Sequence, residues 1–154
     1  MPTTAPAPVE RSIFFWGLTL SMLCYSIGVL SFAIYATYQL HFGRGKEVLS
    51  EAMGTEAYNN YIAETFGMTV SVLVITTFII LTAALIYLIK KEYKCAKILL
   101  LAFIACIAIT ITANMAKYGD IQTSIGPLFF LYWVIIAALF FYAYRYDRLS
   151  KVSI

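Results

Sequence analysis

The feature that most constrains this chain is a series of four long apolar runs separated by shorter polar segments. The runs cover about residues 12–40, 68–89, 96–116 and 127–144 of a 154-residue sequence. Hydrophobic residues make up 62% of the chain and charged residues only 12%, whereas soluble domains carry about 25% charged residues. A soluble fold could not cover so much apolar surface, so lipid must solvate much of it. We therefore expect an integral membrane protein.

Each run is long enough to cross a bilayer as a helix, which takes about 20 residues. Backbone N–H and C=O groups in hydrocarbon must be paired within the protein, and only helices and closed barrels achieve this. Continuous apolar runs favour helices over the short alternating strands of a barrel. The first run would span about 43 Å, so it must tilt or project beyond the bilayer. The sequence thus predicts an all-α, up-down-up-down bundle of four transmembrane helices.

The distribution of Lys and Arg predicts the orientation of this bundle. Eight of them fall on the side that holds the N-terminus, the loop after the second run and the C-terminus, and three fall on the other side. Because positive residues are retained in the cytoplasm, both termini are expected there, in a plasma or inner membrane. The eight are Arg11, Lys90, Lys91, Lys94, Lys97, Arg145, Arg148 and Lys151; the three are Arg44, Lys46 and Lys117.

The polar segments complete the expected domain organisation. Residues 1–11 are rich in Pro, Ala and Thr and read as a disordered cytoplasmic tail, residues 12–146 form the transmembrane domain, and residues 147–154 form a cytoplasmic C-terminal tail. The external loop 41–67 has apolar residues at helical spacing, which predicts a short amphipathic helix between the first two spans. Those apolar residues are Val48, Leu49, Ala52, Met53, Tyr61 and Ile62.

The first run carries a regular row of small residues with spacings of 4, 3, 4 and 3. Such a row keeps one helix face narrow and lets another helix approach closely, which is how membrane helices pack. It predicts a helix-packing face, either within the bundle or as a seam to another subunit. The row consists of Gly17, Ser21, Cys24, Gly28 and Ser31.

The third run carries a polar stripe that becomes more polar toward the external side. Thr110, Asn114 and Lys117 follow Cys106 at spacings of 4, 4 and 3, and Glu64 enters the second run from the same side. One interpretation is a helix end with a lysine that extends to the interface. The other is an outward-facing polar vestibule that binds a small ligand, with Thr110, Asn114, Lys117 and Glu64 as its candidate residues.

The fourth run is crowded with aromatic residues at both ends. This placement is typical of the two aromatic belts of a membrane protein. A groove for a lipophilic cofactor or substrate is the alternative interpretation. The aromatic residues are Phe129, Phe130, Tyr132, Trp133, Phe140, Phe141, Tyr142, Tyr144 and Tyr146.

The sequence lacks the patterns of several chemical classes. The three cysteines and the single histidine, His41, have no metal-ligand spacing, and one histidine cannot hold a haem between two. The middle of each run is free of ionisable residues, which coupled carriers usually need. A nucleophile paired with a base, a phosphate-binding loop and a nucleic-acid-binding patch are missing too. The sequence therefore specifies no catalytic residue, metal or cofactor.

These observations favour a non-catalytic structural or accessory subunit that packs in the bilayer with itself or with other membrane proteins. A small channel or carrier, with the polar stripe at its outer mouth, is the first alternative. A membrane enzyme that holds a lipophilic molecule in the aromatic groove is the second.

Overall fold

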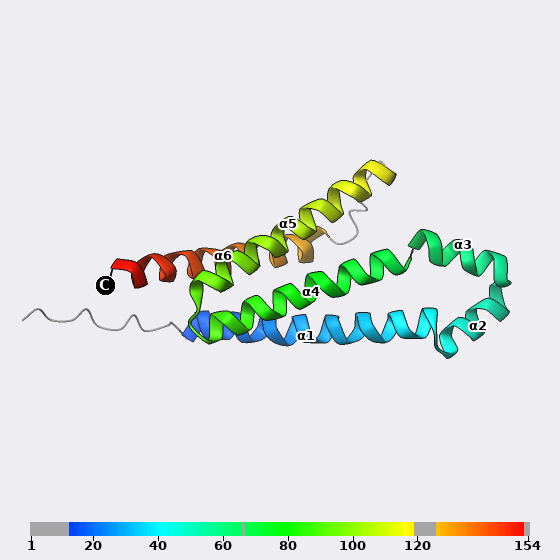
Figure 1. Cartoon of the computed structure of the whole chain (residues 1–154), viewed down its shortest axis with the longest axis horizontal. Helices are drawn as coiled ribbons and strands as arrows, with labels where there is room; N and C mark the ends of the chain where they lie inside the picture. Colours follow the sequence, from blue (N-terminus) through cyan, green and yellow to red (C-terminus); the bar gives the residue numbers. More distant parts are fainter. Residues whose placement is uncertain (1–12, 66, 119–125, 153–154) are drawn as a thin grey trace, which may run out of the picture.

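The computed structural model describes residues 13–65, 67–118 and 126–152, and these residues are helical apart from short turns (Figure 1). The all-helical class expected from the sequence is confirmed for this part of the chain, which contains no strand. The helices are α1 (Ile13–His41), α2 (Arg44–Met53), α3 (Thr55–Thr65), α4 (Met68–Ile89), α5 (Tyr93–Tyr118) and α6 (Gly126–Val152).

Three of these helices are long and apolar enough to cross a membrane. They are α1, α4 and the segment Tyr93–Thr110 of α5. The side chains of residues 126–130, at the start of α6, lie outside the described part, and α6 ends in the polar sequence YRYDRLSKV. A fourth span through α6 therefore stays a prediction.

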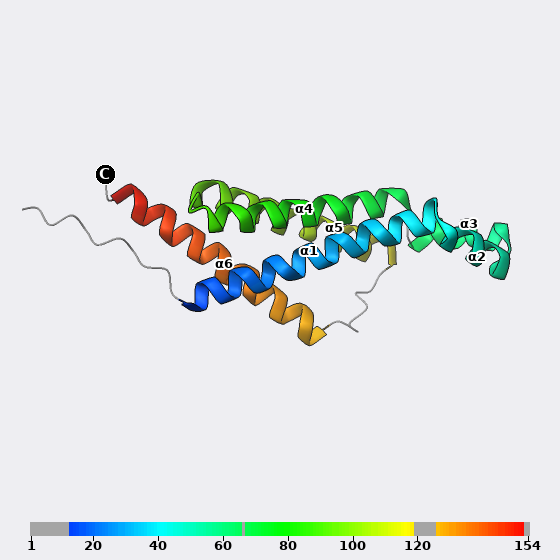
Figure 2. The ribbon, with the colours of Figure 1, turned by 90° about the horizontal axis from the view of Figure 1, so that it is seen from below.

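The long helices pack around α4. This helix lies antiparallel to α1 on one side and to α5 on the other, and α6 packs mainly against α5 (Figure 1). Figure 2 shows that α6 also crosses the first half of α1. The described core is made of large apolar side chains from all four helices, and its fully buried members include Phe15, Leu81, Leu85, Leu88, Leu100, Phe103, Ile136 and Leu139.

The bundle has two ends of different character. One end, here called the basic end, is formed by the start of α1, the turn between α4 and α5, and the end of α6. The other, here called the loop end, is where α2 and α3 extend beyond α1 and α4 (Figure 1). Most of the described core lies in the half of the bundle near the basic end, because the buried residues of α1 fall within 15–26 and those of α5 within 96–103.

The connection between α1 and α4 contains two short helices rather than the single one expected. The break falls at Gly54, whose φ of 86° lies in the left-handed region that favours glycine. The Tyr58 hydroxyl in α3 donates a hydrogen bond to the Leu40 carbonyl in the last turn of α1, and Tyr58 is buried. This bond ties α3 back onto α1. In contrast, α2 buries no residue and exposes Val48 and Met53.

Helix α6 continues past residue 144, where the fourth apolar run ends, to Val152. Its last turns are held by Asp147, which forms ion pairs with Lys97 of α5 and with Lys151 one turn further along α6. Apolar periodicity carries no signal for such charged contacts, so the sequence alone did not indicate this extension.

Candidate functional site

The small-residue row of α1 lies on the exposed side of this helix in the described part of the chain. Its five members, Gly17, Ser21, Cys24, Gly28 and Ser31, are all exposed. A Cβ atom added at Gly17 or at Gly28 would meet no atom of the described chain within 4 Å. Both glycines of the row therefore face open space within the described bundle, and whether the row packs inside the protein or against another subunit stays a prediction.

The side of α1 that faces the bundle is a different stripe. Phe15, Thr19, Met22 and Ser26 are buried, at spacings of 4, 3 and 4. This stripe is offset from the small-residue row by two residues, which corresponds to about 200° around a helix. Helix α1 thus buries one side against its own chain and presents the small residues on nearly the opposite side.

Ser26 fixes the inner stripe to α4 through two polar contacts, the longer of which joins its hydroxyl to the Phe78 carbonyl at 3.4 Å. The hydroxyls of Ser26 and Thr82 lie 2.7 Å apart and share a hydrogen bond. The Thr82 hydroxyl also lies 2.8 Å from the Phe78 carbonyl of its own helix, to which it can donate. Sequence reasoning missed this pair, because both residues look like self-satisfied hydroxyls in an apolar run.

The row continues beyond Ser31 with the same spacing. Tyr35 and Tyr38 follow it at intervals of 4 and 3, and both are exposed. The outer face of α1, defined here as the small-residue row plus Tyr35 and Tyr38, therefore repeats every 3.5 residues on average from Gly17 to Tyr38. That period is the one that keeps a seam between two helices in register as they wind around each other.

The proposed polar vestibule is described at only one of its four residues. The Thr110 hydroxyl donates to the Cys106 carbonyl, 2.8 Å away in the preceding turn, and is half-buried. The backbones of Asn114, Lys117 and Glu64 belong to α5 and α3, but their side chains lie outside the described part. The vestibule therefore stays a prediction.

An ion-pair cluster joins α5 to α6 near the basic end. Lys97 Nζ lies 2.7 Å from Asp147 Oδ2, and Lys151 Nζ lies 3.4 Å from the same oxygen. Asp147 is buried, with only 8% of its side chain exposed. The hydrogen bond from Lys97 holds the pKa of the Asp147 carboxyl below its ordinary value, against the effect of burial, and Lys151 lowers it further. The signal in the sequence was Lys97, a charge inside the third apolar run.

Aromatic rings at the basic end are divided between the interior and the surface. The ring of Phe15 packs edge-on against Tyr142 and Tyr146 at 5.4 and 5.8 Å, and Tyr146 stacks on Tyr93 at 5.1 Å. Phe141 and Tyr144 are exposed instead. The last run therefore contributes both to the core and to the exposed surface of the described bundle.

One buried polar atom in α6 has no partner in the described residues. It is the Tyr132 hydroxyl oxygen. The Tyr132 ring lies 5.7 Å from that of Tyr25 in α1 and 6.3 Å from that of Phe103 in α5. Phe129 and Phe130, the other aromatic residues expected near this position, have side chains outside the described part.

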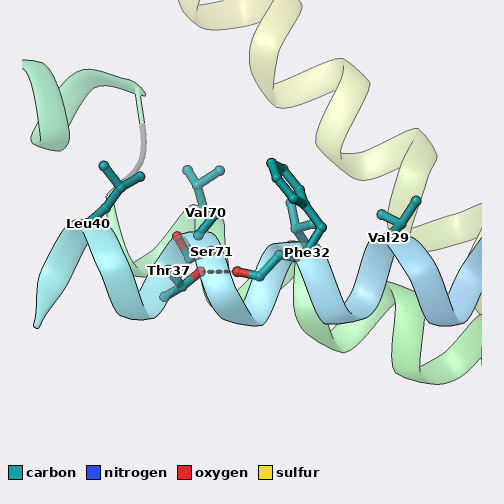
Figure 3. A pocket seen from close by; sticks show the side chains of 9 residues that line it. Val29, Phe32, Thr37, Leu40, Val70 and Ser71 are labelled. Carbon is teal, nitrogen blue, oxygen red and sulfur yellow. Dashed lines mark hydrogen bonds between the residues drawn. The ribbon is translucent and has the colours of Figure 1, made fainter. Parts of the chain in front are cut away.

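A shallow apolar groove of about 210 Å³ lies between α1 and α4 in the half near the loop end (Figure 3). The Thr37 hydroxyl at its edge donates to the Ala33 carbonyl, 2.7 Å away, and so is satisfied within α1. The groove offers packing surface rather than directed polar groups. Its lining residues include Val29, Phe32, Thr37, Leu40, Val70 and Ser71.

The described residues contain no cluster of three or more His, Cys, Asp or Glu side chains that could hold a metal ion. Comparison of the chain with protein-family models, with curated proteins and with solved structures finds no match. The class of protein is therefore defined by the chain itself. Its three apolar helices indicate a helical protein embedded in a membrane.

Proposed function

We propose that this chain is a non-catalytic membrane subunit that associates with another membrane-embedded helix through the outer face of α1. The observation that carries the proposal is the direction of the small-residue row, which is exposed along its whole length and lies opposite the buried stripe of α1. A face of small residues allows a second helix to approach its backbone closely, and the two helices then gain van der Waals contacts. Lipid chains make fewer such contacts with this face.

The second element of the proposal is the topology. In this account α6 is a fourth span, the bundle runs up-down-up-down, and both termini lie in the cytoplasm. The packing of α6 against α5 and the concentration of Lys and Arg at the basic end support this arrangement. The outer face of α1 would then be available to a partner within the bilayer.

The channel and enzyme alternatives receive less support from the described residues. A pore lined by the polar stripe needs hydroxyl groups directed at its lumen, but Thr110 hydrogen-bonds its own helix. An aromatic groove on α6 needs free ring faces, but Tyr142 and Tyr146 pack into the core against Phe15. The outer face of α1, in contrast, is exposed from Gly17 to Tyr38 in the described bundle and is therefore accessible to a partner.

The proposal is tested by enlarging one residue of the row. Gly28→Leu fits the chain itself, because a side chain there meets open space within the described structure. We expect this variant to lose the partner during gentle extraction, as measured by native mass, with its thermal stability unchanged. The matched control is Ala105→Leu, which introduces the same side chain at an exposed position of α5. A Gly28→Leu variant that stays assembled but loses thermal stability would show that the row packs internally.

A further inference from the structure

The basic end carries a cluster of positive charges that the described residues do not neutralise. Seven basic and two acidic residues are described there, a net charge of +5 by difference. Only Lys97 and Lys151 form ion pairs, both with Asp147, among the described residues. The other five are exposed and make no ion pair in the described part; this basic patch consists of Lys90, Lys91, Lys94, Arg145 and Arg148.

The Asp147 cluster brings the two parts of the patch together. Because Lys97 contacts Asp147, the first turns of α5 lie beside the last turns of α6. Lys94 lies one turn before Lys97, and Arg148 is the next residue after Asp147, so both are carried to the same end of the bundle (Figure 1). The buried carboxylate is already shared by two lysines, and the one other acid described at this end is the exposed Glu92.

The turn between α4 and α5 has a lysine where glycine is the usual residue. The Glu92 N–H donates to the Tyr87 carbonyl and the Lys91 N–H to the Leu88 carbonyl, which is the pattern that closes many helices. The residue that takes the left-handed conformation in this pattern is Lys91, with φ of 66°. This turn therefore places a charged side chain, rather than a glycine, at the end of α4.

The position of the patch at the ends of the apolar helices indicates which kind of partner it binds. Lys90 directly follows Ile89, the last residue of the apolar helix α4, and Lys94 lies in the first turn of α5, before its apolar run. These ammonium groups therefore lie at the level where hydrocarbon gives way to headgroups. Polybasic clusters next to a membrane span bind anionic lipids by charge. We infer that the basic patch is a binding surface for the phosphate groups of anionic phospholipids. This inference does not depend on the proposed role of α1.

The test uses Trp16, which lies beside Phe15 at the basic end, as a reporter of the nearby lipid. The full chain with Trp133→Phe is reconstituted in vesicles of phosphatidylcholine and phosphatidylglycerol, in which either lipid carries brominated chains. We expect brominated phosphatidylglycerol to quench Trp16 more than brominated phosphatidylcholine does. Arg145→Gln with Arg148→Gln should reduce this preference by about tenfold, given the strength of charge–surface attraction.

The matched control removes the same number of charges at the loop end. Arg44→Gln with Lys46→Gln should keep the preference for phosphatidylglycerol. Equal quenching by the two lipids in the parent chain, or equal loss of preference in both double variants, would overturn the inference. A third result would also overturn it: soluble glycerol phosphate displaces phosphatidylglycerol more strongly than chloride does at the same ionic strength. The site would then bind free phosphate esters rather than a lipid surface.

Discussion

Lys97 and Asp147 form an ion pair of 2.7 Å that joins the first turns of α5 to the last turns of α6. The carboxylate is buried and the ammonium is partly exposed, so salt and water screen this pair less than a pair on the surface. The same two helices also meet through the ring pairs Tyr93–Tyr146 and Phe103–Tyr132.

Loss of this carboxylate should destabilise the contact between α5 and α6. Asp147→Asn is expected to lower the free energy of unfolding in detergent by about 2 kcal/mol, because Lys97 loses a charged acceptor. Glu92→Gln, which removes an exposed acid at the same end, is the control and should have little effect. Thermal unfolding followed by circular dichroism measures both changes. Equal stability of Asp147→Asn and the parent chain would contradict the role given to the pair.

The same group predicts a dependence of stability on pH. The pKa of Asp147 is lower in the folded chain than its ordinary value, so its contribution is fully present above the ordinary carboxyl pKa of about 3.9. The contribution is lost as the pH falls through that value and then through the lowered one. The parent chain should therefore lose more stability on acidification than Asp147→Asn does. Parallel pH profiles of the two proteins would count against this reading.

The hydroxyl pair of Ser26 and Thr82 should stabilise the contact between α1 and α4 only modestly. Interhelical hydrogen bonds in membranes contribute about 0.6 kcal/mol on average. Thr82→Val keeps the shape and removes the bond, and we expect a loss of that size in a chemical unfolding experiment. Thr112→Val is the control, because the Thr112 hydroxyl bonds only the Ala108 carbonyl of its own helix among the described contacts. A loss that is the same in both variants would assign no stability to the interhelical bond.

Lys91→Gly should change stability and lipid binding in opposite directions. Glycine adopts a φ of 66° without the crowding of a Cβ, so the free energy of unfolding should rise by about 1 kcal/mol. The preference for phosphatidylglycerol should fall, because one charge of the basic patch is lost. Lys90→Gly removes an equal charge at a residue with φ of −72°, so it should weaken lipid binding without the gain in stability. An unchanged lipid preference in both variants would remove Lys90 and Lys91 from the binding surface.

The proposed topology can be tested with one cysteine at each end of the bundle. Cys95 is exposed in the first turn of α5 at the basic end. In a Cys24→Ser, Cys106→Ser background, an impermeant maleimide should label Cys95 only when the cytoplasmic side is accessible. Ser50→Cys in α2, with Cys95 also replaced by serine, should be labelled from the opposite side. In the proposed topology one span, α4, separates the two positions. Labelling of both cysteines from the same side would therefore contradict this topology.

The sequence indicated the helices better than it indicated how they pack. Helix α4 begins at Met68 and ends at Ile89, as expected, because Gly67 and Lys90 bound its apolar run sharply. The row of small residues on α1 was visible from its spacing, but its direction was not, since a narrow face suits an inner contact and an outer seam equally well. The position of Ser26, two residues beyond Cys24 and on the inner side, became meaningful only once Thr82 was seen opposite it.

The contact between Lys97 and Asp147 could not be predicted from the sequence for a related reason. The two residues are separated by 50 positions in the chain, and positive-inside statistics treat each only as a charge on one side of the membrane. The candidate vestibule differs again, because the side chains of Asn114, Lys117 and Glu64 lie outside the described part. The vestibule therefore stays a prediction from the sequence.

The central claim, that the outer face of α1 meets a partner within the bilayer, is tested most directly by photo-crosslinking in the native membrane. A photoreactive amino acid replaces Cys24, in the middle of the small-residue row, or Ala105, at an exposed position of α5. We predict a discrete covalent adduct with a protein from position 24 but not from position 105, and its loss when Gly28→Leu is added. Lipid adducts alone at position 24, or the same protein adduct from both positions, would contradict the account.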